Sequence, residues 1–197
     1  MKLLKNALGL MPVLLALSSG AATAQAVSVV SSGQDAADCS MAATLVSQGL
    51  AFSAEGKADC DRALEFGQLG RRDKAATYSN RGILRLAEND FTAAIADFNK
   101  AVAMMPGLAE AYIGRGNAIF MTGDPGQAVD DYQQALDLQL REAHIANFNL
   151  GLAFEKLGNL AMAETRYRQA LGLQPGWDLA QQKLDAVVAR LQSPPTP

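Results

Sequence analysis

The sequence has few of the residues on which active sites and metal sites depend. Its 197 residues include one histidine, His144, and two cysteines, Cys39 and Cys60. A Ser-His-Asp or Cys-His arrangement would have to use His144, which lies near the start of an expected helix. A zinc site would lack ligands. We therefore expect no catalytic residue, no metal site and no cofactor, and a protein that is not an enzyme.

Positive charge is also scarce. Seventeen lysines and arginines stand against twenty acidic residues, and the formal net charge is −3. No excess of basic side chains is present to follow a phosphate backbone, so we expect no nucleic-acid partner. Apolar residues make up 49% of the chain and charged residues 19%. That composition favours a packed core over a disordered chain.

Long apolar runs are missing except near the N-terminus. Two lysines within the first five residues precede the apolar run 7–17, and small residues follow it. This order is typical of a secretory signal peptide. We expect residues 1–26 to be the signal, with the mature chain starting at Gln25 or Val27. The mature protein would then be periplasmic or secreted, with no membrane span; the alternative is an uncleaved N-terminal anchor.

The expected state of the two cysteines, bonded or free, depends on whether the protein is exported. An even number of cysteines in an exported protein favours a disulfide, here Cys39–Cys60. The bond would close a loop of about twenty residues and add about 3 kcal/mol to stability on the chain-entropy model. The alternative is two buried thiols that are not bonded.

The chain contains an internal repeat. Gly82, Gly116 and Gly151 are separated by 34 and 35 residues. Three further columns keep this step: Ala94, Ala128 and Ala163; Phe98, Tyr132 and Tyr167; Ala101, Ala135 and Ala170. Four columns with one spacing predict a stack of similar structural units.

Each unit is expected to hold two helices. In the first unit the marker residues Tyr78, Arg81, Gly82 and Arg85 are spaced so that they share one helical face. A short turn rich in Gly, Asn and Asp follows each first helix. The second helices are expected at residues 91–104, 125–138 and 160–173.

These columns resemble the tetratricopeptide repeat, whose pattern is an aromatic residue, Leu-Gly, Tyr, then Ala, Phe and Pro at fixed offsets. The third unit departs from it at Asn147, and the second has Leu140 in place of proline. The third unit matches at Leu150, Gly151, Phe154, Ala163, Tyr167 and Pro175. The resemblance implies an all-α fold, a right-handed superhelical stack of antiparallel helix pairs (an α-solenoid) with a C-terminal capping helix.

The repeats divide the chain into segments. Before them, we expect a first helix at residues 40–52 and a second at 57–67. The expected organisation is a signal peptide at 1–26, a linker at 27–34, an N-terminal helical cap or degenerate repeat at 35–74, repeats at 75–108, 109–143 and 144–177, a capping helix at 178–192 and a tail at 193–197.

The resemblance also implies a function. In this family the first helices line the inner face of a curved stack, which binds an extended peptide or a helix of a partner protein. Phe120 and Phe148 are the expected anchors, because aromatic residues dominate interfaces; the alternative is that both pack inside the stack. The candidate partner-binding residues are Ser79, Ile83, Leu86, Ile113, Asn117, Phe120, Phe148, Leu152 and Glu155.

We therefore expect a non-enzymatic interaction scaffold or adaptor in the bacterial periplasm with a protein or peptide partner. Two alternatives are an accessory or regulatory subunit of an envelope enzyme complex, and a hydrolase that uses unassigned carboxylates. Arg81 and Arg115 stand where the repeat pattern has an apolar residue. We expect them to lie along the surface or to pair with Asp97 or Asp131 on the second helices.

Overall fold

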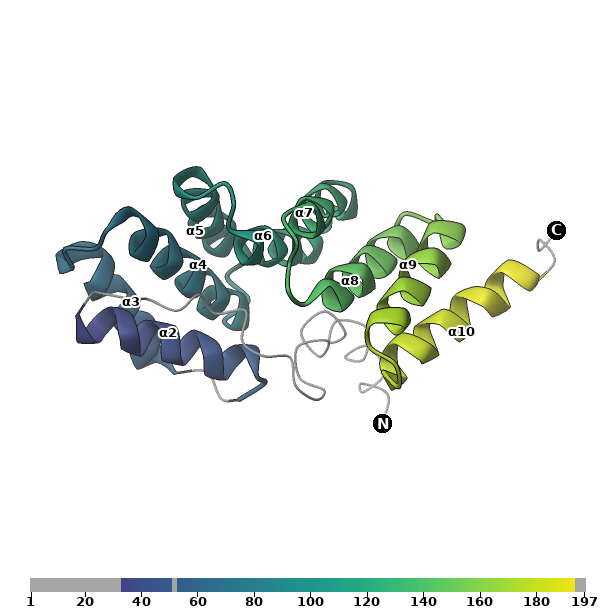
Figure 1. Cartoon of the computed structure of the whole chain (residues 1–197), viewed down its shortest axis with the longest axis horizontal. Helices are drawn as coiled ribbons and strands as arrows, with labels where there is room; N and C mark the ends of the chain where they lie inside the picture. Colours follow the sequence, from purple (N-terminus) through teal and green to yellow (C-terminus); the bar gives the residue numbers. More distant parts are fainter. Residues whose placement is uncertain (1–32, 51–52, 194–197) are drawn as a thin grey trace, which may run out of the picture.

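The computed structural model describes residues 33–50 and 53–193, which form α-helices and no strands (Figure 1). The expected signal peptide and most of the expected linker and tail lie outside these residues. None of the described helices has the length and apolarity of a membrane span. The helices are α2 (Gln34–Ser47), α3 (Ala54–Phe66), α4 (Arg71–Ala87), α5 (Phe91–Met104), α6 (Ala109–Thr122), α7 (Pro125–Asp137), α8 (Ala143–Lys156), α9 (Leu160–Leu173) and α10 (Asp178–Gln192).

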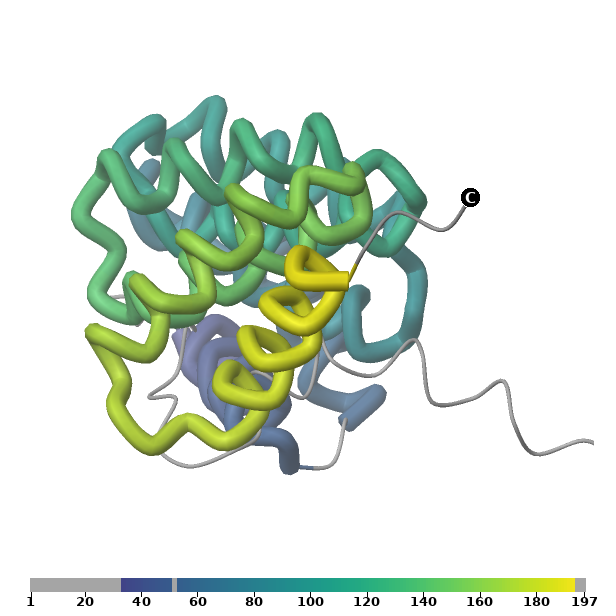
Figure 2. The backbone as a smooth tube through the Cα atoms, turned by 90° about the vertical axis from the view of Figure 1, so that its right-hand side faces the viewer, coloured from purple at the N-terminus to yellow at the C-terminus, as the bar shows by residue number. Residues whose placement is uncertain are grey.

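The helices form a stack of pairs. Helices α2 and α3, α4 and α5, α6 and α7, and α8 and α9 pack against each other within a pair, and α10 packs against α9. The pairs follow one another along an arch, with α5 and α7 on its outer side and α6 and α8 on its inner side (Figure 1). Figure 2 looks along the stack from the α10 end. The predicted all-α stack of helix pairs is confirmed.

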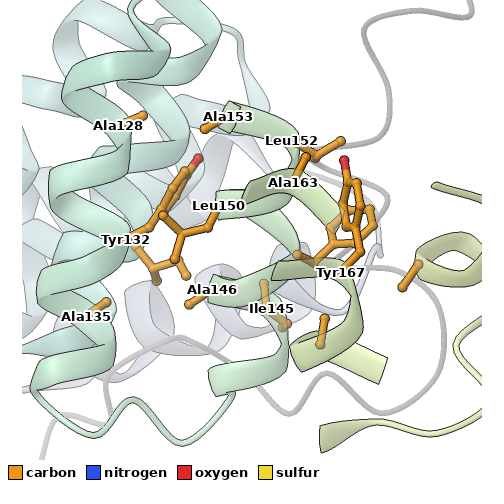
Figure 3. Packing of buried hydrophobic residues seen from close by; sticks show 14 of the residues in the cluster. Ala128, Tyr132, Ala135, Ile145, Ala146, Leu150, Leu152, Ala153, Ala163 and Tyr167 are labelled. Atoms are coloured by element: carbon orange, nitrogen blue, oxygen red, sulfur yellow. The ribbon is translucent and has the colours of Figure 1, made fainter. Parts of the chain in front are cut away.

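The repeated glycines make room for the aromatic rings of the repeated Phe/Tyr column. A Cβ atom added at Gly151 would lie 2.4 Å from the ring of Tyr167, and one at Gly116 would lie 2.7 Å from the ring of Tyr132. Both rings are completely buried between the helices (Figure 3). Any side chain at these positions would push the paired helices apart. The spacing of 34 and 35 residues between the glycines therefore marks the point where the helices of each pair approach most closely.

Capping side chains start the second helices. Asp90, Asp124 and Asn159 each accept a hydrogen bond from the backbone N–H three residues later. Just before each cap, the backbone takes the left-handed conformation, with φ of 62° at Asn89 and 95° at Gly123. The second helices therefore begin at residues 91, 125 and 160, as predicted.

The extra residue between the second and third repeats is absorbed by a loop. Residues 138–142 separate α7 from α8, whereas residues 105–108 and 174–177 suffice between the equivalent helices. Gln139 takes a left-handed φ of 59° in this loop. Leu140, which replaces the proline of the pattern, is buried in the core. The stacking is therefore unbroken at this junction.

The first helix of the N-terminal pair was predicted in the wrong place. The sequence suggested residues 40–52, but α2 spans Gln34–Ser47, so Gln34 belongs to a helix and not to the linker. Gly33 precedes α2 without a side-chain cap, which removes the usual start signal. Helix α3 also starts earlier than predicted, because Ser53 caps it by accepting a hydrogen bond from the N–H of Gly56.

The predicted Cys39–Cys60 bond would join the two helices of this N-terminal pair. Cys39 of α2 and Cys60 of α3 face each other with Cα atoms 4.8 Å apart and sulfur atoms at bonding distance. Both side chains are fully buried. Cys60 lies 34 residues before Ala94. It therefore occupies, in the N-terminal pair, the position that alanine occupies in the three repeats. The cysteines thus occupy a helix–helix contact that small side chains fill in the other pairs.

Loss of this link is expected to lower the free energy of unfolding by about 3 kcal/mol, because about twenty residues of the unfolded chain would gain freedom. Urea unfolding of the protein purified under oxidising conditions, with and without reductant, measures the change. The Cys39→Ala, Cys60→Ala double variant is the control and should not respond to reductant. An unchanged midpoint on reduction, or two free thiols by mass, would contradict the prediction.

Candidate interaction surface

The first helices of the three repeats form one side of the stack. Helix α4 contacts α6, and α6 contacts α8, so the three follow one another without a gap. We call the side that they form the inner face. All nine residues predicted to bind a partner lie on these helices. Their burial decides which of them a partner can reach.

Most of the predicted residues are inside the protein. Ser79, Ile113 and Phe148 have no exposed surface, which contradicts their expected role as contact residues on an open face. The cause is close packing, since α2 covers part of α4 and the first helices lie directly against each other. Ile83, Leu86, Asn117 and Leu152 are also buried. Only Phe120 and Glu155 are partly exposed.

Phe148 packs the capping segment onto the stack. Its ring centroid lies 4.6 Å from that of Trp177 and 5.6 Å from that of Tyr167. Trp177 immediately precedes α10 and is itself buried. For Phe148 the alternative of packing inside the stack is therefore correct. Phe120 remains the one predicted aromatic anchor with exposed surface.

Glu155 is held by groups of its own chain. Its carboxylate accepts hydrogen bonds from the hydroxyl of Tyr167 at 3.0 Å and from Arg190 of α10 at 3.1 Å. Lys183 lies 3.6 Å away on the same helix as Arg190. Burial, and then the charge of Glu155, raises the pKa of Tyr167. Glu155 therefore docks the capping helix, which the sequence analysis did not anticipate.

A pair of amide side chains lies beneath the inner face. Asn117 Oδ1 accepts hydrogen bonds from Asn149 Nδ2 at 2.8 Å and from the hydroxyl of Tyr132 at 3.0 Å. Asn149 Oδ1 and Ser79 Oγ are buried, and neither has a hydrogen-bond partner among the described residues. Asn149 was not among the predicted residues, although an asparagine next to Phe148 on a first helix could have indicated a polar contact there. A buried acceptor without a hydrogen-bond partner is unfavourable, so a donor that reached it would stabilise the protein.

The predicted ion pairs between helices are confirmed. Arg81 donates to both oxygens of Asp97, at 2.8 and 2.7 Å, and Arg115 binds Asp131 in the same two-bonded way. Burial alone would lower the pKa of Arg81, but its bonds to Asp97 and Asp61 outweigh burial and raise it. Each arginine also lies over a tyrosine of its own helix, Tyr78 or Tyr112. We call each such set a Tyr–Arg–Asp triad.

His144 is a half-buried neighbour of Trp177. The two rings meet edge to face with centroids 5.5 Å apart. Burial lowers the pKa of His144 from 6.5, and the nearby charge of Glu142 opposes this only in part. The folded state thus favours the neutral imidazole.

Stability is therefore expected to fall as the pH drops below about 6.5, because His144 of the unfolded chain takes up a proton first. The stabilisation should be complete above that pH. Melting temperatures at pH 7.5 and 5.5 test this for the natural protein and for His144→Gln. The loss on acidification should be smaller in the variant; an equal loss in both would contradict a role for His144.

The comparisons with known proteins agree with this architecture. The sequence model of the family "Tetratricopeptide repeat" matches residues 79–138 and 122–178, which together cover half of the chain. The chain belongs to the tetratricopeptide repeat family. No curated protein gives a significant match.

Solved structures show the same fold at low sequence identity. The crystal structure of MamA is 23% identical over 69% of this chain and 77% of its own, with a TM-score of 0.62. A thermophilic tetratricopeptide repeat protein of Thermus thermophilus is 18% identical over 79% and 82%, with a TM-score of 0.65. The first such domain of Spaghetti, bound to an HSP90 peptide, is 24% identical over 62% and 96%, with a TM-score of 0.60.

Proposed function

We propose that this protein is a non-enzymatic interaction scaffold of the bacterial periplasm that binds a peptide or helix of a partner protein on its inner face. Tetratricopeptide repeat proteins are generally interaction scaffolds without enzymatic activity. The similar domain of Spaghetti is bound to a peptide of HSP90. Both facts support peptide binding as the function of this stack.

One observation carries the proposal. Phe120 is a partly exposed aromatic side chain, and it lies one helical turn after Asn117, whose amide joins α6 to α8. An aromatic side chain beside a buried polar pair is typical of an interface centre, where apolar contact gives affinity and hydrogen bonds fix orientation. The buried Oδ1 of Asn149, which has no hydrogen-bond partner among the described residues, is a suitable acceptor for a backbone N–H of a bound chain.

The periplasmic location rests on two features. The N-terminal sequence has the order of a secretory signal, and its expected cleavage leaves a mature chain that starts at Gln25 or Val27. The two cysteines also face each other, an arrangement that an oxidising compartment preserves as a bond.

Affinity capture from the envelope fraction tests the function. Phe120→Ala is expected to reduce recovery of the partner and to weaken its affinity about thirtyfold, since truncation of a central aromatic residue costs about 2 kcal/mol or more. Titration of the captured partner against the purified variant gives the change in Kd.

Phe66→Ala is the matched control. Phe66 is 72% exposed and lies at the end of α3, outside the inner face, so its truncation removes the same ring from another surface. Binding should survive in this variant. Equal binding by Phe120→Ala and the natural protein, with both folded by circular dichroism, would refute the inner face as the binding surface.

A further inference from the structure

The two Tyr–Arg–Asp triads neutralise their own charge. In the first repeat, Arg81 faces Asp97, and in the second, Arg115 faces Asp131. Each arginine also reaches the second helix of the preceding unit, through Asp61 of α3 or Asn99 of α5. The guanidinium groups of both triads are thus paired with a carboxylate of the same chain.

The third repeat changes all three members of the triad together. At the repeat step of 34 and 35 residues, Tyr112 is followed by Asn147, Arg115 by Leu150, and Asp131 by Arg166. The positive charge has moved from the first helix to the second, and the carboxylate is gone. Asn147 stands in place of the tyrosine, so the third repeat lacks the ring over which the arginine of the other triads lies.

Arg166 binds only neutral groups among the described residues. Its Nη2 donates to Gln133 Oε1 of α7 at 3.0 Å, and its Nη1 donates at 3.3 Å to the amide oxygens of Asn147 and Gln169. Its Nε is buried and has no hydrogen-bond partner in this part of the protein. Burial lowers its pKa, and no nearby acidic group offsets the effect. A partly buried guanidinium without a counter-charge is costly, and an incoming anion removes that cost.

We propose that Arg166, framed by Gln133 and Asn147, is a binding site for a carboxylate side chain of an acidic protein segment. The occupant is assigned from the chain itself, since Asp97 and Asp131 show that a carboxylate fits the arginine of this stack with two hydrogen bonds. Asn147 and Gln133 hold the arginine in place, with their amide oxygens on its donors. Arg166 and Gln133 lie on the second helices α9 and α7, and Asn147 lies on α8. None of the nine residues predicted to bind a partner on the inner face belongs to this site, so it does not depend on the proposed function.

A peptide of four glutamates tests this site on the mature, full-length chain. The arginine Nε–H signal of Arg166 in a proton–nitrogen correlation spectrum should shift and saturate as tetraglutamate is added. The Nε–H signals of Arg81 and Arg115, already bound to aspartates, serve as internal references and should stay in place. A tetraglutamine peptide should shift none of them.

Binding of fluorescein-labelled tetraglutamate, followed by anisotropy, gives the energetic test. Arg166→Gln should weaken binding at least about tenfold, because the charge-assisted hydrogen bonds to the carboxylate are lost. Arg168→Gln is the matched control: Arg168 is more exposed, lies one residue beyond Tyr167 on α9 and pairs with Glu164, so its loss should leave binding unchanged. Phe120→Ala should also leave it unchanged, which separates this site from the inner face.

Three results would overturn the site. They are equal weakening by Arg166→Gln and Arg168→Gln, which would show only a general attraction of charge; equal binding of tetraglutamine; and no shift of the Arg166 Nε–H signal. Because the signal shift is measured on the natural protein, it decides the question even where Arg166→Gln fails to fold.

Discussion

Gly151→Ala is expected to lower the free energy of unfolding by about 1–2 kcal/mol, although it adds a single methyl group and removes a glycine from a helix. The new Cβ would lie 2.4 Å from the ring of Tyr167, which is completely buried. Overpacking of a tight core costs about 1–3 kcal/mol, and the glycine-to-alanine gain in helix propensity offsets only part of that. Urea unfolding followed by circular dichroism measures the difference.

Gly172→Ala is the matched control for this prediction. Gly172 lies inside α9 and is exposed, and a Cβ added there would meet nothing within 4 Å. The same chemical change should therefore stabilise the protein by about 0.5–1 kcal/mol, since alanine loses less backbone freedom on folding. Two changes of equal sign would show that helix propensity, and not the contact between paired helices, sets the glycine column.

Asp97→Ala is expected to cost about 3–5 kcal/mol, the usual loss when one partner of a buried ion pair is removed. The Asp97 side chain is 1% exposed and binds both Arg81 and Arg85, with nitrogen–oxygen distances of 2.7 Å to each. Its loss would remove the carboxylate that Arg85 binds and would leave Arg81 with only the exposed Asp61 as counter-charge. Thermal and urea unfolding measure the change.

Added salt and a variant at an exposed position complete the test of Asp97. Since Asp97 is shielded from solvent, added salt should recover little of the lost stability. Asp130→Ala removes an exposed carboxylate from α7 and should change stability by no more than about 0.5 kcal/mol. A loss at Asp97 that is as small as the loss at Asp130 would show that the triads contribute nothing to the stack.

Local signals in the sequence were sufficient to predict the repeats. Glycine and ring columns kept one spacing because each pair of helices meets at one narrow point, as Gly116 and Tyr132 show. The starts of the second helices were also readable, since caps such as Asp124 and turn residues such as Gly123 act over a few residues. The arginine–aspartate pairs followed from the same register.

The N-terminal pair and the inner face could not be predicted in detail. Helix α2 is rich in alanine and lacks a side-chain cap, so nothing in its sequence fixes where it begins. On the inner face, the pattern identified the correct helices but not the depth of each residue. Phe120 and Phe148 each follow a marker position of a first helix, yet Phe148 packs against Trp177 and is buried, whereas Phe120 is partly exposed. The burial of Phe148 depends on a contact with the capping segment, which no local spacing encodes.

The strong contacts of each described helix are confined to its own pair and the adjoining ones. In such a stack, small rotations between neighbouring helix pairs add up to a large change in curvature, while the packing at each junction is kept. The distance between the α2 and α10 ends can therefore change at little cost.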